Sequence, residues 1–129
     1  MLLNLTDLSA EPLQSQIIRQ IRAKILTGEL KADSDLPSIR RLARDQRISV
    51  ITVQRAYEGL EREGLIHSRR GKGFFVSHLS DAQKKSLALE RLKENLKLPL
   101  QAALSEGLEK DEIYEVVESL VKKAKSIEK

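Results

Sequence analysis

The sequence contains no cysteine and no tryptophan, and aromatic residues make up only 3% of its 129 positions. The absence of cysteine excludes a disulfide framework and thiolate metal sites, and it is typical of a reducing compartment. Because 40% of the residues are hydrophobic and so few are aromatic, any core is built from Leu, Ile and Val. The length is enough for one small domain, or for a small domain with an appendage.

Long apolar runs are also missing. None approaches the ~18 residues that a membrane span requires. The first seven residues, MLLNLTD, have neither a basic start nor a long apolar stretch, so they do not resemble a signal peptide. We therefore expect a soluble cytoplasmic protein with no membrane partner.

The net charge of +4 is distributed unevenly along the chain. Residues 1–79 hold 13 basic and 9 acidic side chains, whereas residues 80–129 hold 10 of each. Arginine outnumbers lysine in the first part, and its planar fork of donors suits phosphates and guanine edges. A solvated basic face is the alternative interpretation, and only the spacing of the charges separates the two.

The spacing of apolar residues predicts three helices, a hairpin and two further helices. The first helix covers residues 11–26, a short second helix follows Pro37 and is capped by Ser38, and the third covers residues 49–63. Gly64 and Leu65 resemble a Schellman ending of the third helix. Short strands are expected at residues 65–68 and 74–77, joined by RRGKG, in which two glycines supply the positive φ of a tight turn.

The C-terminal part begins with SDAQ at residues 80–83, which is a capping box. The helix that it opens ends at Gly107, and Pro99 is expected to bend or break it near Asn95. A last amphipathic helix is expected over residues 110–126. The fold class is therefore mostly α: a winged helix-turn-helix domain at residues 1–78, followed by a short two-helix tail at residues 79–129.

This order of elements places the third helix where its N-terminal end can enter a major groove. Ser49, Ile51, Thr52 and Arg55 face away from its buried side, and they offer hydroxyls, a cover for a thymine methyl and a guanidinium. The hairpin would then lie over the neighbouring minor groove or backbone, where its cations meet the most negative potential. Phe74 with Val76, or Phe75 in the alternate register, anchors it to the core.

The sequence of the hairpin allows two other interpretations. A P-loop is excluded because GKG lacks the spaced first glycine and the Ser or Thr after Lys. A plain exposed turn remains the structural alternative, but the charged hairpin coincides with a charged helix pair.

The segment LPSIRRLARDQRISVITVQRAYEGLEREGLIHSRRGKGFFV resembles the DNA-binding domain of the GntR family of bacterial transcription regulators. The resemblance runs from about residue 11 to residue 76, and the short helical tail is similar to that of the YtrA-like subfamily. It implies that Ser38 and Thr52 touch phosphates, that Arg40 faces bases, and that Gly71 enters the minor groove. The chain departs from the family at Val50 and Gln54, and its Ala32-Asp33 replaces the usual Pro-Gly, which suggests a looser bend. The DNA-binding residues expected together are Ser38, Arg40, Arg41, Ser49, Val50, Ile51, Thr52, Gln54, Arg55, Arg69, Arg70, Gly71 and Lys72.

The tail carries more apolar surface than its two helices can hide on each other. At ~25 cal/mol per Å2, leaving several Leu and Val side chains in water costs several kcal/mol. A second copy of the chain is the simplest cover, and a twofold dimer predicts a palindromic site with half-sites ~34 Å apart or a multiple. The alternative is a monomer whose tail folds onto its own first domain. The expected interface consists of Leu89, Leu92, Leu96, Leu100, Leu104, Ile113, Val117, Leu120 and Val121.

No residues suggest catalysis, a cofactor or a metal. His67 and His78 have no cysteine nearby, and carboxylates are scattered, so a metal site is not expected. Glu61 and Glu63 lie two apart on a helix and do not face each other. No nucleophile–base pair is present, so we do not expect an enzyme.

The interpretation favoured by the sequence is a homodimeric, sequence-specific DNA-binding transcription factor, acting as a repressor on a double-stranded operator. Nonspecific nucleic-acid binding and a winged-helix module for protein interaction remain alternatives. A small-molecule effector, if one exists, is expected between the domains or near Pro99, and the residues do not identify it.

Overall fold

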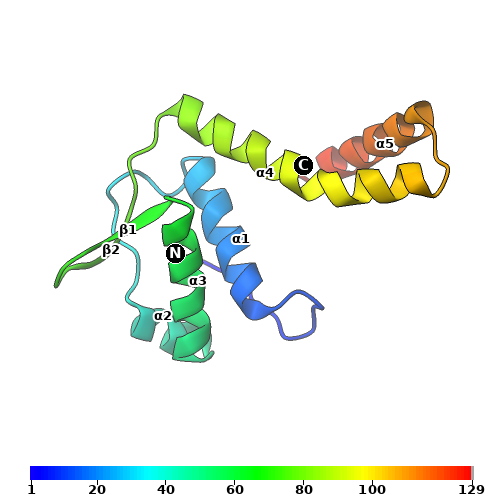
Figure 1. The fold of residues 1–129 in the computed structure, drawn as a ribbon. Helices are drawn as coiled ribbons and strands as arrows, with labels where there is room; N and C mark the ends of the chain where they lie inside the picture. The colour runs from blue at the N-terminus through cyan, green and yellow to red at the C-terminus, as the bar shows by residue number, and fades with distance from the viewer. Residues whose placement is uncertain (129) are drawn as a thin grey trace. The chain divides into compact units, whose positions relative to one another are not determined.

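The structure is a computed structural model that describes residues 1–128, and within them the chain forms five helices and one two-stranded sheet. The helices are α1 (Leu13–Leu26), α2 (Ile39–Gln46), α3 (Val50–Arg62), α4 (Asp81–Ser105) and α5 (Lys110–Glu128). The strands are β1 (Ile66–Arg69) and β2 (Gly73–Val76), paired antiparallel. The architecture is mostly helical, as expected, with the winged helix followed by two further helices (Figure 1). No helix in the described residues is both long and apolar enough to cross a lipid bilayer.

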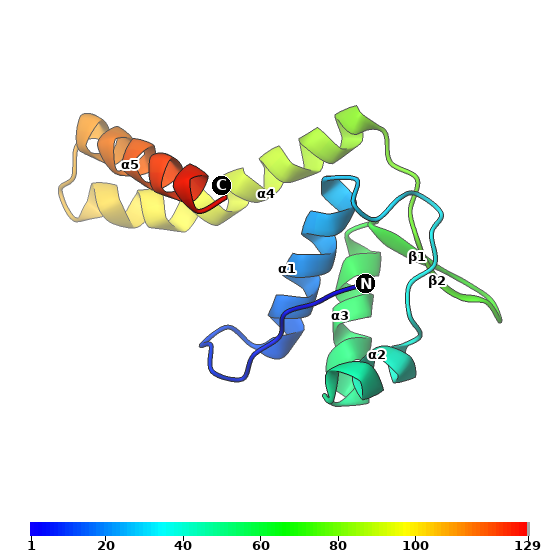
Figure 2. The ribbon, with the colours of Figure 1, turned by 180° about the vertical axis from the view of Figure 1, so that it is seen from behind.

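The chain divides into two compact units, Met1–Lys85 and the residues from Ser86 onward. In the first unit α3 is the central helix, because α1, α2 and β1 all contact it. The hairpin of β1 and β2 projects away from the three helices in both views (Figures 1 and 2). The core is aliphatic apart from one tyrosine, and its fully buried side chains include Ile17, Ile21, Ile25, Val53, Tyr57, Leu60, Leu65, Ile66 and Val76.

Local signals in the sequence set the ends of these helices. The Oγ atoms of Ser38 and Ser49 accept hydrogen bonds from the backbone amides of Arg41 and Thr52, so both serines cap the helices that follow them. Gly64 has φ of 77°, and the Leu65 amide donates to the Leu60 carbonyl, which confirms the Schellman ending of α3. This ending occupies Leu65, so β1 begins one residue later than expected.

The hairpin adopts the register in which Phe74 and Val76 face the core. Ile66 pairs with Val76 and Ser68 with Phe74. Val76 is buried, and the Phe74 ring packs edge-on against Tyr57 with 5.1 Å between ring centroids. The alternate register, with Phe75 as the anchor, is therefore wrong. Phe75 lies on the other face of the hairpin, stacked on His67.

A third extended segment joins the sheet, and the sequence did not indicate it. Asp35 forms an antiparallel bridge with Phe75, and the amides of Asp33 and Leu36 donate to the carbonyls of Val76 and Phe74. The loop between α1 and α2 is therefore tied to the hairpin by main-chain hydrogen bonds. The bend at Ala32-Asp33 is formed with Asp33 in the left-handed region, at φ of 65°.

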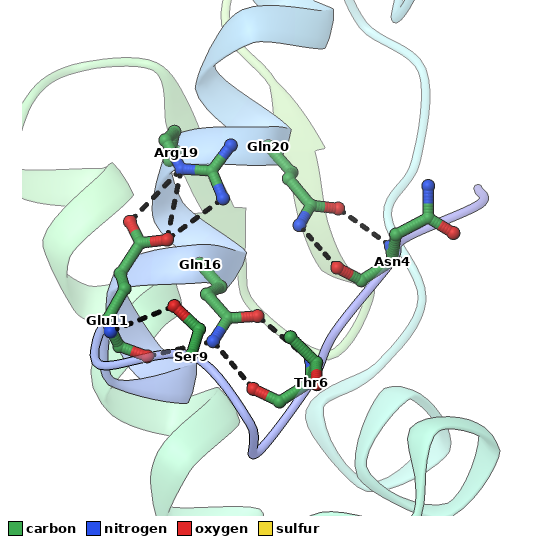
Figure 3. Close-up of polar contacts among 7 residues, drawn as sticks. All are labelled: Asn4, Thr6, Ser9, Glu11, Gln16, Arg19 and Gln20. Carbon is green, nitrogen blue, oxygen red and sulfur yellow. Dashed lines mark hydrogen bonds and ion pairs between the residues drawn. The ribbon is translucent and has the colours of Figure 1, made fainter.

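The segment from Asn4 to Thr6 is held against α1 by two glutamine amides (Figure 3). The Gln20 side chain both donates to and accepts from the Asn4 backbone, and the buried Gln16 side chain does the same with Thr6. The Arg19 guanidinium donates to the Glu11 carboxylate and holds the pKa of that carboxyl below its ordinary value. These contacts keep Leu3 buried, although it lies in no helix or strand itself.

In the second unit, α4 and α5 leave their apolar side chains largely in water. The capping box of α4 is present, since the Ser80 amide donates to Gln83 Oε1 and the Gln83 amide donates to Ser80 Oγ. Two outcomes were expected at Pro99, a bend or a break, and the break does not occur, because α4 continues to Ser105. Proline removes only its own amide donor, and the bonds on either side keep the helix together while its axis changes direction (Figure 1).

Candidate nucleic-acid interface

The turn between α2 and α3 is short because each side of it is closed by hydrogen bonds. Arg47 ends α2 in the left-handed region, at φ of 56°, and the Ile48 amide donates to the Ala43 carbonyl. Ser49 then caps α3, and its Oγ lies 2.8 Å from Thr52 Oγ1. The two hydroxyls therefore sit together at the first turn of α3, beside backbone amides that have no partner within the helix.

The first turn of α3 presents apolar side chains to solvent. Val50 and Ile51 are 45% and 58% exposed, while Val53, Ala56, Tyr57 and Leu60 on the opposite face are fully buried. Gln54 and Arg55 are also exposed, and Thr52 is half-buried. The structure thus brings the six expected recognition residues of this helix to one exposed end. Uncovered aliphatic groups at a helix N-terminus are suited to thymine methyl groups in a major groove.

The arginines of α2 are exposed, but they differ in their partners. Arg41 and Arg44 both approach the carboxylate of Asp45, at 3.7 Å and 4.0 Å. Arg40 makes no ion pair among residues 1–128 and projects into solvent. Such exposed pairs contribute little to stability, so all three guanidinium groups are available to a polyanion. Arg44 and Arg47 were not in the expected set, although their charge and helical spacing are visible in the sequence.

The tip of the hairpin carries two cations that no carboxylate neutralises within the part of the chain that the structure describes. Arg70 and Lys72 are exposed, and the Lys72 amide donates to the Arg69 carbonyl to close the turn. Gly71 and Gly73 have φ of 73° and 100°, which confirms that both glycines supply left-handed conformations. Nothing lies within 4 Å of a Cβ built on Gly71, so the main chain there is open to an approaching surface.

Arg69 differs from its neighbours at the tip. Its guanidinium lies 3.4 Å from the Asp33 carboxylate and its Cζ lies 4.3 Å from the centre of the Phe75 ring. The three residues come from β1, from β2 and from the extended segment before α2. Arg69 was expected among the DNA-binding residues, and the structure places it in contacts within the protein.

Tyr57 is a buried residue of α3 that contacts both the segment before α2 and the hairpin. Its hydroxyl donates to the Pro37 carbonyl at 2.7 Å, directly before the cap of α2, and its ring contacts Phe74 of the hairpin. Burial raises the pKa of the Tyr57 hydroxyl well above its ordinary value, so the group stays protonated and remains a donor. One side chain of α3 therefore fixes both the start of α2 and the base of the hairpin, a role that the sequence did not indicate.

Six of the nine residues of the expected dimer interface are exposed in the single chain, and the other three, Leu96, Leu100 and Ile113, are half-buried. No side chain of α4 is buried, and Leu89, Leu92 and Leu104 are each at least half exposed. On α5, Leu120 is 60% exposed and Val121 49%. Leu98, Tyr114 and Val116 are exposed as well, although they were not in the expected set. Exposed apolar side chains are clustered on these two helices and are not scattered singly. Such clustering is typical of an interaction surface.

No group of three or more His, Cys, Asp and Glu side chains within residues 1–128 is arranged to hold a metal ion. The exposed surface of α2, α3 and the hairpin offers cations, hydroxyls and small apolar groups. That combination matches the phosphate contacts and base contacts of a winged helix-turn-helix on duplex DNA.

Comparison with known proteins gives a consistent result. The family model described as "Bacterial regulatory proteins, gntR family" matches residues 13–76. The "HTH-type transcriptional repressor YtrA" of Bacillus subtilis is 33% identical over 112 residues, which cover 87% of this chain and 86% of that protein. Similarity therefore continues past the hairpin into the C-terminal helices.

Solved structures are similar over the same range. A GntR family transcriptional regulator from Listeria monocytogenes matches with a TM-score of 0.69 and 27% identity, covering 86% of this chain and 96% of that one. YtrA from Sulfolobus acidocaldarius, a GntR-family transcription factor, matches with a TM-score of 0.55 and 31% identity, covering 93% and 97%.

Proposed function

The chain belongs to the gntR family of bacterial regulatory proteins, with the short helical tail of its YtrA-like members, and on this premise we propose that it is a homodimeric repressor of a palindromic operator. It is a transcription regulator with a winged-helix DNA-binding domain. The dimeric state, the form of the operator and the residues that contact it are the proposal.

The observation that carries the proposal is the exposed first turn of α3. Val50 and Ile51 are uncovered there, beside the paired hydroxyls of Ser49 and Thr52. Exposure of aliphatic side chains to water is unfavourable. On DNA they can pack against thymine methyl groups while the hydroxyls bind phosphates. Arg40 and Arg55 supply guanidinium groups for base edges or phosphates, and Ser38, Arg41 and Gln54 complete this part of the proposed contact set.

The hairpin supplies a second contact. Arg70 and Lys72 are exposed at its tip, and Gly71 between them leaves the backbone accessible. A cationic tip beside a helix in the major groove meets the backbone or the adjacent minor groove. These contacts orient the protein on the duplex and carry little sequence information.

The dimer is supported by the apolar surface of α4 and α5. Covering it with a second copy removes several Leu and Val side chains from water, each worth ~1.5–3 kcal/mol when fully buried. A twofold dimer presents two α3 helices to one face of the duplex, and it therefore selects two inverted half-sites. Repression follows from occupancy, because a dimer on a promoter blocks polymerase, and the similar Bacillus protein is itself named a repressor.

The proposal is tested by selecting bound fragments from genomic DNA and then mapping the protected bases. We expect inverted repeats whose centres are about one helical turn, ~34 Å, or a multiple apart. Fragments with a single half-site, or with no shared sequence, would contradict the palindromic dimer. The protein then acts in the cytoplasm, at the nucleoid when bound.

A further inference from the structure

Arg69 is held on one face of the hairpin by two partners. His67 and Arg69 of β1 share that face with Phe75 of β2, because side chains two apart on a strand point the same way. The guanidinium covers the Phe75 ring at 4.3 Å and reaches the Asp33 carboxylate at 3.4 Å. Its side chain therefore crosses the whole sheet, from β1 over β2 to the segment that precedes α2.

Asp33 lies in the left-handed region of the backbone, at φ of 65°. Glycine adopts this conformation without steric cost, and aspartate is one of the few other residues that visit it. The Asp33 amide donates to the Val76 carbonyl, so the backbone is fixed there by the sheet. The carboxylate of Asp33 is the group that meets Arg69.

We propose that Arg69 is a positioning residue for DNA binding, which holds the hairpin against the segment before α2, and that it is not itself a phosphate contact. Asp33 and Phe75 form the other two parts of this brace. Through it the hairpin tip, with Arg70 and Lys72, keeps a fixed position relative to the Ser38 cap of α2. The inference rests on the proposed DNA surface and refines the part that the hairpin plays in it.

The opposite hypothesis is that Asp33 competes with DNA for Arg69. In that case a phosphate replaces the carboxylate when the duplex binds. The two hypotheses predict opposite signs for one substitution, Asp33→Asn. If Asp33 is a competitor, its neutralisation frees Arg69 and tightens binding; if Asp33 is part of a brace, its neutralisation loosens the hairpin and weakens binding.

The test is a titration of a short random-sequence duplex at several salt concentrations. For Asp33→Asn we expect binding weakened about two- to fivefold, the scale of one exposed ion pair. For Arg69→Ala we expect about three- to tenfold, because the cation–π contact is lost as well. The slope of log affinity against log salt should stay unchanged, because no phosphate contact is lost. Lys72→Ala is the positive control, and its slope should fall by about one per protomer.

Asp35→Asn is the matched charge control. It removes the same charge two residues away in the same segment, and Asp35 makes no ion pair within residues 1–128. Removing an acidic group near the duplex should leave binding equal or slightly tighter. Tighter binding by Asp33→Asn, a slope reduced by Arg69→Ala, or no effect of either variant would overturn the proposal.

A measurement on the free protein separates this inference from the proposed function. Amide hydrogen exchange at Lys72, whose amide donates to the Arg69 carbonyl, should be faster in Asp33→Asn and Arg69→Ala than in the parent and in Asp35→Asn, while the core amides of α3 keep their protection. Unchanged exchange at the tip contradicts the brace even if DNA binds. If the parent protein does not bind duplex, the proposed function fails whatever the exchange data show.

Discussion

Arg40 and Lys72 are both exposed cations, but they lie on different elements, and the difference predicts different effects. Arg40 projects from the first turn of a helix that lies beside α3, so it is placed to reach base edges. Lys72 lies at the tip of a hairpin, so it is placed to reach the backbone. Contacts to bases select sequence, whereas contacts to phosphates add affinity that salt screens.

For Arg40→Ala we expect a loss of ~1–3 kcal/mol on the selected operator and a relaxed choice of base at one position of each half-site. The loss has this size because the hydrogen-bond acceptors on the base edge lose their guanidinium donor. Titration of operator variants at one salt concentration measures both effects. Arg62→Ala is the control, since it removes an exposed guanidinium at the far end of α3. An equal loss on operator and random duplex would contradict the assignment of Arg40 to a base.

For Lys72→Ala we expect weaker binding to every sequence by a similar factor, together with a lower salt dependence. The physical reason is that one fewer counterion is released from the duplex for each protomer. Parallel titrations of operator and random duplex over a range of salt provide the measurement. A loss confined to the operator would show that Lys72 contacts a base.

Tyr57 shows how a buried residue shapes an exposed surface. Replacing it with phenylalanine removes the hydrogen bond to the Pro37 carbonyl and leaves the ring on Phe74. For Tyr57→Phe we expect a decrease of about 1 kcal/mol in the free energy of unfolding. Denaturant titration measures it. Tyr114→Phe, at a 60% exposed position of α5, is the control and should leave stability unchanged; an equal loss in both variants would contradict this account.

At the scale of elements, the short turn between α2 and α3 includes a residue in an unfavourable backbone conformation, and a substitution can relieve it. Arg47 occupies a left-handed position, where a side chain costs about 1–2 kcal/mol. Glycine avoids that cost, although it loses about 0.5–1 kcal/mol through the entropy of the unfolded chain. Arg47→Gly should therefore raise the free energy of unfolding by about 0.5–1 kcal/mol, which corresponds to a few degrees in Tm.

Arg47→Ala is the matched control for that substitution. It removes the same charged side chain but keeps the Cβ atom, so it should not stabilise the protein. Thermal unfolding of the two variants side by side decides the question. Equal Tm values would mean that the backbone conformation contributes nothing and that the charge of Arg47 is responsible.

Most of the elements follow from signals that act over a few residues. Ser38 and Ser49 cap helices, Gly64 ends one, and the hairpin glycines close a turn; each of these is a local backbone preference, and each is present in the structure. The spacing of the α3 side chains likewise separated the exposed end from the buried face. These features could be predicted because sequence neighbours determine them.

The features that the sequence did not predict depend on contacts between distant residues. The extended segment at Asp35 pairs with a strand that lies forty positions along the chain, and no local pattern identifies it. The same holds for the bond from Tyr57 to Pro37 and for the contact of Arg69 with Asp33. A charged residue in a basic loop suggests a nucleic-acid contact, and its contact with a carboxylate distant in sequence is visible only in the folded structure.

At the scale of the whole molecule, the proposed repressor consists of two copies of the chain. Leu120 lies on the exposed apolar face of α5, and a charge placed there would be buried in the proposed interface without a partner. For Leu120→Glu we expect dissociation to a monomer, which sedimentation measures directly. Ser119→Glu adds the same charge one position away on the same helix and should remain dimeric. A dimeric Leu120→Glu variant would place the interface elsewhere.

The loss of the dimer should also appear in DNA binding. A monomer contacts one half-site, so its affinity for the palindrome falls steeply and its preference for the second half-site disappears. The unit Met1–Lys85 is unchanged by a substitution in α5, so its own contacts to a half-site should persist.

The central claim is that the cationic surface of α2, α3 and the hairpin selects a particular duplex sequence. The most direct test is the ratio of the two dissociation constants, for the selected operator and for a scrambled duplex of equal length, at one physiological salt concentration. A sequence-specific regulator should give a ratio of about 1,000 or more in favour of the operator. A ratio near one would contradict the claim and identify the protein as a nonspecific binder.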